Sequence, residues 1–182
     1  TLYDKDGQVA AQWVKSSLKA ENMAEALQEF VDGLTDDAAG KFKPVKAPKH
    51  SDEDLLTVYP MCDPHLGMLA YAEECGEAFD LKIAERDIQA AVRHLTSASP
   101  RSAHALVLNL GDFFHADNNS GMTAKSGNVL DVDTRWSKVL RVGARIMFWI
   151  VEQALRRHGH VTVVNRPGNH DEHSALFLSL IL

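Results

Sequence analysis

From residue 54 onward, apolar runs alternate with amphipathic stretches along the chain. The runs "DLLTVYPMCD" (54–63), "ALVLNLGD" (105–112) and "HVTVVNRPGN" (160–169) are short, apolar and followed by turn-forming residues, which is typical of strands. Between them, apolar residues recur at helical spacing in residues 80–98 and 133–159. Strands that alternate with helices predict an α/β fold with a largely parallel core sheet.

The two amphipathic stretches also indicate which helical faces are buried and where the second helix ends. In residues 80–98, Ile88, Val92 and Leu95 share one face. Asp133 is predicted to cap the start of the second helix, and Gly159 is predicted to follow its end. The residues expected to be buried on that helix are Trp136, Val139, Leu140, Ile146, Ile150 and Leu155.

Residues 1–50 differ in pattern and are predicted to form a small N-terminal element and linker, separate from a larger domain over residues 51–182. Asp6-Gly7 lies between two short alternating runs, which predicts a β-hairpin. Residues 20–34 have helical periodicity. The Lys- and Pro-rich residues 41–54 are typical of a linker.

Composition narrows the class of protein. The chain of 182 residues is 45% hydrophobic, with a net charge of −6, which suits one globular domain with a small appendage. No apolar stretch reaches the roughly 20 residues that cross a bilayer, so we expect no membrane partner. The chain has no signal-peptide pattern and only two cysteines, Cys62 and Cys75, which predicts reduced thiols in a cytoplasmic protein. The acidic charge argues against coating nucleic acid by charge alone, although bound metal ions would change the charge at a nuclease site. Cys62 is expected to be a buried, reduced thiol.

Each predicted strand is followed by a polar turn: "CDPHLG", "GDFFHADN" and "PGNHDEH". A solvated loop would explain any one of them. Because the carboxyl ends of parallel strands meet at one edge of a sheet, the three turns together predict a shared site. Carboxylate, imidazole and amide groups are ligands of divalent ions such as manganese, iron and zinc. The residues expected to converge are Asp63, His65, Asp112, His115, Asn169 and His170.

The motifs "DPHLG", "GDFFH" and "GNHDEH" resemble, in this order, those of the calcineurin-like metallophosphoesterases. The resemblance covers residues 54–182, and "DPHLG" and "GDFFH" are most similar to the exonucleases that repair DNA double-strand breaks. It implies the N-terminal half of a layered α/β metallophosphoesterase core, a sheet flanked by helices. The family completes its metal site with downstream histidines that lie beyond this chain. The apolar end "SALFLSLIL" also lacks a cap, so we expect a domain truncated at its C-terminus.

The resemblance implies a role for each motif residue. Asp63 and His65 would bind a first metal ion, and Asn169 would bind a second. Asp112 would bridge both ions, because a carboxylate has two oxygens. Manganese is expected for the two divalent ions, with iron or zinc as alternatives.

The remaining motif residues would be catalytic. His170 would be the general acid for the leaving oxygen, and Asp171 would orient its ring. His115 would lie near the phosphate or support His170. His173, next to this turn, is either structural or part of the site, and the long polar loop 116–134 is a candidate to line the substrate cleft.

The resulting hypothesis is a dinuclear metal-dependent phosphoesterase that hydrolyses phosphodiesters with a metal-bound hydroxide, DNA being one candidate substrate. A small-molecule phosphomonoesterase and a non-catalytic binding module that retains the fold are the alternatives. Because ligands of the family pattern are missing, residues 1–182 alone are expected to bind at most one well-ordered ion and to show no turnover.

Overall fold

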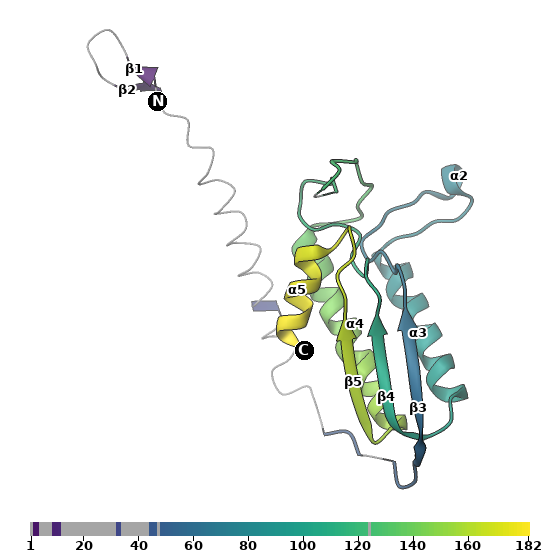
Figure 1. The fold of residues 1–182 in the computed structure, drawn as a ribbon. Coiled ribbons are helices and arrows are strands. Elements are labelled where there is room, and N and C mark those ends of the chain that lie inside the picture. The colour runs from purple at the N-terminus through teal and green to yellow at the C-terminus, as the bar shows by residue number, and fades with distance from the viewer. Residues whose placement is uncertain (1, 4–8, 12–31, 34–43, 47, 124) are drawn as a thin grey trace.

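A three-stranded parallel sheet, with helices on one of its faces, organises the part of the chain that follows residue 51 (Figure 1). The computed structural model describes residues 2–3, 9–11, 32–33, 44–46, 48–123 and 125–182. The strands are β3 (Asp52–Met61), β4 (Ser102–Asn109) and β5 (His160–Asn165), in the order β3-β4-β5. The predicted α/β class with a parallel sheet is therefore confirmed.

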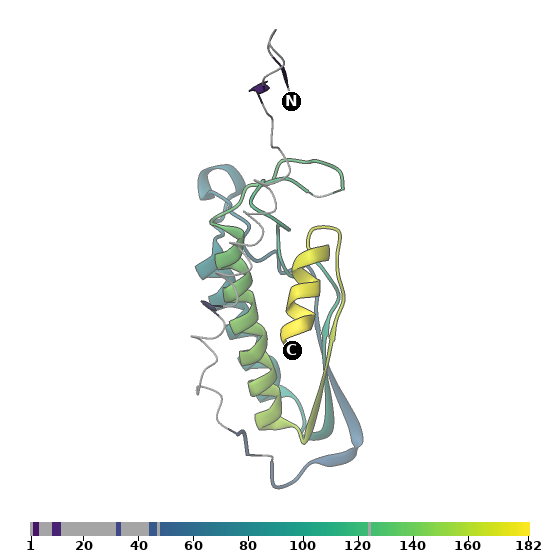
Figure 2. The same cartoon turned by 90° about the vertical axis from the view of Figure 1, so that its left-hand side faces the viewer.

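Two long helices cover one face of this sheet, as the turned view in Figure 2 shows: α3 (Leu81–Ala98) and α4 (Trp136–Arg157). The hydrophobic core lies between these helices and the sheet, and it includes Val107 of β4 and Ile146 of α4, each 0% exposed. Alternate residues of a strand point to opposite faces, and Leu56 and Val58 on β3 are exposed. The helices thus bury one side of the sheet.

Two shorter helices complete the described part of the chain. The four-residue helix α2 (Ala72–Cys75) lies in the segment after β3. Helix α5 (Glu172–Ile181) follows β5, and its Ala175 carbonyl accepts a hydrogen bond of 2.7 Å from the Asn165 side chain of that strand. No helix in the described ranges is both long enough and apolar enough to cross a membrane.

At the N-terminus, β1 (Leu2–Tyr3) pairs antiparallel with β2 (Val9–Ala11), as expected for the two arms of a hairpin. The predicted turn at Asp6-Gly7 and most of the helix predicted over 20–34 lie outside the described residues. Residues 44–46 and 48–50 form neither helix nor strand, and β3 starts at Asp52, inside the predicted linker.

The ends and faces of the two long helices differ in part from the prediction. Helix α4 starts at Trp136, whose backbone N–H donates 2.8 Å to the side chain of Asn119, so Asp133 is not its cap. On α3, Leu95 is 46% exposed and Thr96 is buried instead. Thr96 lies one full turn after the buried Val92, to whose carbonyl its hydroxyl donates, so the buried face ends on Thr96 in place of Leu95.

Candidate metal centre

The loops that leave β3 and β4 stay paired beyond the ends of their strands. The backbone N–H of Asp63 donates 3.3 Å to the Gly111 carbonyl, and that of His65 donates 3.0 Å to the Asp112 carbonyl. These bonds continue the parallel pairing, so the two loops run side by side. The first two polar motifs are therefore in contact through their backbones.

Backbone strain is concentrated in these two loops. Asp63, His65 and Asp112 have φ angles of 49°, 46° and 49°, and they are the non-glycine residues with positive φ in the described ranges. Such conformations cost about 1–3 kcal/mol each and persist where the surrounding structure imposes them, often at functional sites. All three are residues predicted to bind metal.

Two glycines bring the third loop against the second. A Cβ on Gly111 would lie 3.0 Å from the Cα of Gly168, and a Cβ on Gly168 would overlap the carboxylate of Asp112. The backbone N–H of His170 also donates 2.8 Å to the Asp112 carboxylate. Glycine at both positions lets the two turns touch, and this contact brings "GNHDEH" to the site.

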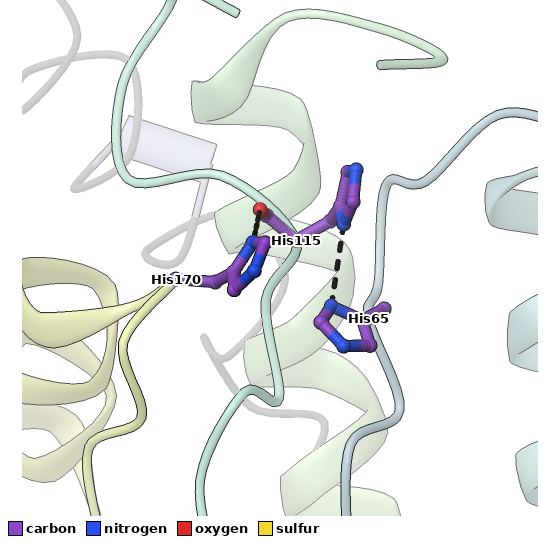
Figure 3. A group of neighbouring side chains, drawn as sticks. All are labelled: His65, His115 and His170. Carbon is purple, nitrogen blue, oxygen red and sulfur yellow. Dashed lines mark hydrogen bonds between the residues drawn. The ribbon is translucent and has the colours of Figure 1, made fainter. Parts of the chain in front are cut away.

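The side chains form two groups of possible metal ligands that share His65. One group is Asp63, His65 and Asp112, and the other is His65, His115 and His170; within each group the ligand atoms lie within 4.8 Å of one another. The Nδ1 atoms of His65 and His115 are 3.2 Å apart (Figure 3). Two nitrogens about 2.1 Å from one ion, at an angle of about 90–109°, lie about 3.0–3.4 Å apart. The donor types and this spacing fit a divalent ion.

His170 joins the group from the third loop with a fixed ring orientation. Its Nδ1 donates 3.0 Å to the His115 carbonyl (Figure 3). The ring stacks on that of His115 with centroids 5.4 Å apart, and lies edge-on to that of His65 at 4.9 Å. With Nδ1 engaged, Nε2 is the nitrogen left for chemistry.

Burial controls the charge of the clustered imidazoles. It lowers the pKa of His65, and the neighbouring His170 lowers it further, while Asp112 and Asp63 raise it. Burial, followed by the charges of the other two rings, lowers the pKa of His115 to about 4. Both rings are therefore neutral near pH 7, and neutral imidazole is the form that binds metal ions.

Asp171 has a different task from the one expected. It was predicted to orient His170, but the His115 carbonyl accepts the Nδ1–H of that ring. The Asp171 carboxylate, 0% exposed, instead accepts the backbone N–H of Gly168 at 2.7 Å and that of Phe114 at 3.2 Å. Burial raises its pKa, and the backbone N–H groups oppose this shift. Asp171 thus ties the second loop to the third.

Other expectations have mixed outcomes. Asn169, the predicted ligand of the second ion, lies in the third turn and is exposed. Asp112, the predicted bridging residue, is 8% exposed. Cys62 is exposed, contrary to the prediction of a buried thiol. It continues the alternation of Val58 and Pro60, which are also exposed, so it lies on the face of the sheet that α3 and α4 leave uncovered.

One buried carboxylate next to these loops, Asp117, was not predicted. Asp117 is 3% exposed and accepts hydrogen bonds from the backbone N–H groups of His173 and Ser174, at 2.9 and 2.7 Å. Asp117 binds the first turn of α5 only because the fold brings the two segments together, and no sequence pattern relates residues 117 and 173. Its position two residues after His115 was the one available signal.

Three features of this centre bear on its function: the clustered donors, the strained backbone of three of them, and the glycine contact between turns. Together they describe a site built from three loops at one edge of the sheet. No protein-family model matches the chain, and comparisons with curated proteins and with solved structures give no match either.

Proposed function

We propose that the protein is a dinuclear metal-dependent phosphoesterase that hydrolyses phosphodiesters. The observation that carries the proposal is the left-handed backbone at Asp63, His65 and Asp112, three donor residues at the ends of two neighbouring strands. Strained residues persist only where the surrounding structure holds them, and they cluster at functional sites. The order of the motifs, which resembles that of the calcineurin-like metallophosphoesterases, supports the same conclusion.

In this proposal, the donor residues would hold two neighbouring metal ions. Asp63 and His65 would hold one ion and Asn169 the other, and the Asp112 carboxylate would bridge them. His115 is a further candidate ligand, because its Nδ1 lies 3.2 Å from that of His65. Divalent ions such as manganese, iron or zinc supply an activated water and neutralise charge on a phosphoryl group.

His170 is the proposed general acid. Its Nδ1–H is held by the His115 carbonyl at 3.0 Å, so Nε2 faces the reacting group and gives a proton to the departing oxygen. The same carbonyl keeps the ring from rotating. Asp171 acts indirectly, through the two loops that it joins.

The decisive experiment measures manganese-dependent hydrolysis by the complete protein that the gene encodes. Bis-p-nitrophenyl phosphate, p-nitrophenyl phosphate and linear DNA are assayed side by side. We expect hydrolysis of the diester that stops when EDTA removes the metal. Cleavage of linear DNA would assign the protein to nucleases, whereas preference for the monoester would favour the small-molecule alternative. Metal binding without turnover of any substrate would identify a non-catalytic module and contradict the proposal.

Replacement of the bridging residue gives the first specific prediction. Asp112→Asn should reduce turnover by at least about 100-fold, as expected when a residue that stabilises the transition state is lost, and should lower the bound metal measured by mass spectrometry. Asp87→Asn, which changes an exposed aspartate on α3, is the matched control and should behave as wild type. Full metal content and normal turnover in Asp112→Asn would show that the bridging role is misassigned.

A further inference from the structure

A buried carboxylate outside the proposed ligand set anchors the start of α5. Asp117 accepts the backbone N–H groups of His173 and Ser174 and the Ser174 hydroxyl, at 2.9, 2.7 and 2.8 Å. These N–H groups belong to the first turn of the helix, where backbone donors have no partner within the helix. Asp117 therefore caps α5 from a distant part of the chain.

The same carboxylate also fixes an imidazole. Nδ1 of His173 lies 2.7 Å from the Asp117 carboxylate. Because a carboxylate accepts hydrogen bonds, Nδ1 must carry the proton. The His173 side chain is 63% exposed and that of Asp117 is 1% exposed, so Nε2 is the nitrogen offered to solvent. A hydrogen bond at one ring nitrogen that defines the role of the other is common among functional histidines.

This pair lies beside the metal centre. Asp117 follows His115 by two residues, and His173 follows His170 by three. His170 bonds to the His115 carbonyl just as His173 bonds to the Asp117 carboxylate. The two segments therefore run together and carry two histidine contacts in succession, the second one next to the metal cluster.

His173 is placed to contact substrate rather than metal. Its nitrogens belong to neither of the two groups of possible ligands found among the described residues. Its neighbour Glu172 forms an ion pair of 3.2 Å with Lys125, so the long polar loop reaches this point as well. The surroundings of His173 are thus open and polar, on the same two segments that carry His115 and His170.

We propose that His173 is a second substrate-contacting histidine, whose Nε2 hydrogen-bonds a phosphate oxygen of the ester. This inference rests on the proposed function and adds a residue to the same site. With Nδ1 bound to Asp117, the ring would link that carboxylate to a bound phosphate through Nε2. Nε2–H then donates to the phosphate while Nδ1–H stays with Asp117.

Kinetics with bis-p-nitrophenyl phosphate and manganese give the first test. His173→Gln should lower kcat/KM by about tenfold, the value of a hydrogen bond to a charged group. Its melting temperature should fall only slightly, because Asp117 keeps its three bonds to the start of α5 and loses one bond to an exposed ring. His94→Gln, the same change at an exposed position of α3, is the matched control. Wild-type kcat/KM in His173→Gln would overturn the inference.

Nuclear magnetic resonance of the histidine rings gives a second test that does not require turnover. In the free protein, the proton of His173 should be on Nδ1. Inorganic phosphate added to the zinc-loaded protein should shift the Nε2 resonance of His173 and leave that of His94 unchanged. A proton on Nε2, or no shift, would overturn the inference. Wild-type protein that hydrolyses no phosphate ester would instead contradict the proposed function, and the phosphate titration would still decide whether His173 contacts the anion.

Discussion

At the scale of single residues, the centre depends on backbone shapes that are unusual for the side chains that carry them. Asp63, His65 and Asp112 hold left-handed conformations, and backbone bonds between the two loops maintain them. The nearby Gly168 has a role of another kind, since its missing side chain leaves room for the Asp112 carboxylate. The left-handed backbone and the space left at Gly168 together determine where the side chains of Asp63, His65 and Asp112 lie.

The contact at Gly168 yields a prediction. Gly168→Ala should lower the free energy of unfolding by about 1–3 kcal/mol, the usual cost of overpacking, because the new methyl group must displace Asp112. It should also weaken manganese binding, measured by calorimetry. Gly76→Ala is the comparison for metal affinity, because nothing lies within 4 Å of a Cβ there and its φ of 86° makes a side chain costly for stability alone. Equal metal affinity in Gly168→Ala and Gly76→Ala would show that the contact does not shape the centre.

The membership of the site was largely predictable, but its internal contacts were not. Asp63, His65 and Asp112 were expected together because parallel strands end at a common edge, and they form one donor group. His115 was expected beside the cluster and lies within it. The left-handed turn at Asp112 precedes His115, and the local sequence does not specify this turn, although Asp adopts such a conformation more often than most residues.

At the scale of elements, helix α3 begins with two carboxylates at its amino end. Its N-cap Asp80 accepts the backbone N–H of Ile83 at 2.7 Å, and Asp133 accepts that of Leu81 at 3.3 Å. Asp133 was predicted to cap α4, and it caps a different helix. A local sequence pattern identifies a capping residue but not which helix end lies nearest in space.

Removal of the closer cap should be measurable. Asp80→Ala should lower the free energy of unfolding by about 1 kcal/mol, because the Ile83 N–H loses its partner. Urea denaturation followed by circular dichroism would measure the change. Asp87→Ala on the same helix is exposed and should have little effect. If Asp80→Ala were as stable as wild type, Asp133 alone would suffice to cap α3.

Element positions were more predictable than element ends. The three apolar runs became β3, β4 and β5 because their patterns are strong and turns follow each of them. Helix α4 starts three residues after the predicted cap, since the Asn119 side chain from a distant loop satisfies its first N–H. The buried face of α3 was misjudged at Leu95 because a polar residue, Thr96, satisfies its own hydroxyl within the helix.

At the scale of the whole molecule, a second polar cluster lies near the start of the sheet. His158 is 0% exposed and lies just before β5. Its Nε2 is 2.6 Å from the Tyr59 hydroxyl, and its Nδ1 is 2.9 Å from the hydroxyl of Ser102, the first residue of β4. The cluster joins the end of α4 to two strands.

Burial of this imidazole predicts a dependence of stability on pH. Burial lowers the pKa of His158 below its ordinary value of 6.5, so the unfolded chain binds more protons than the folded one as the pH falls. The stabilising contribution is complete above pH 6.5 and is lost progressively as the pH falls towards the folded-state pKa. His158→Asn should make the unfolding free energy less dependent on pH between 7 and 5. His94→Asn should leave the slope unchanged, and an unchanged slope in both variants would refute the assignment.

The two polar clusters lie at opposite ends of β4, and this separation has a consequence for evolution. The strand has eight residues, which at about 3.3 Å each separates its ends by about 25 Å. Substitutions that far apart usually have additive effects on stability. Changes around His158 can therefore compensate for destabilising changes at the candidate metal centre without altering its geometry. Residues of the candidate metal centre can therefore change during evolution while the cluster around His158 maintains the stability of the fold.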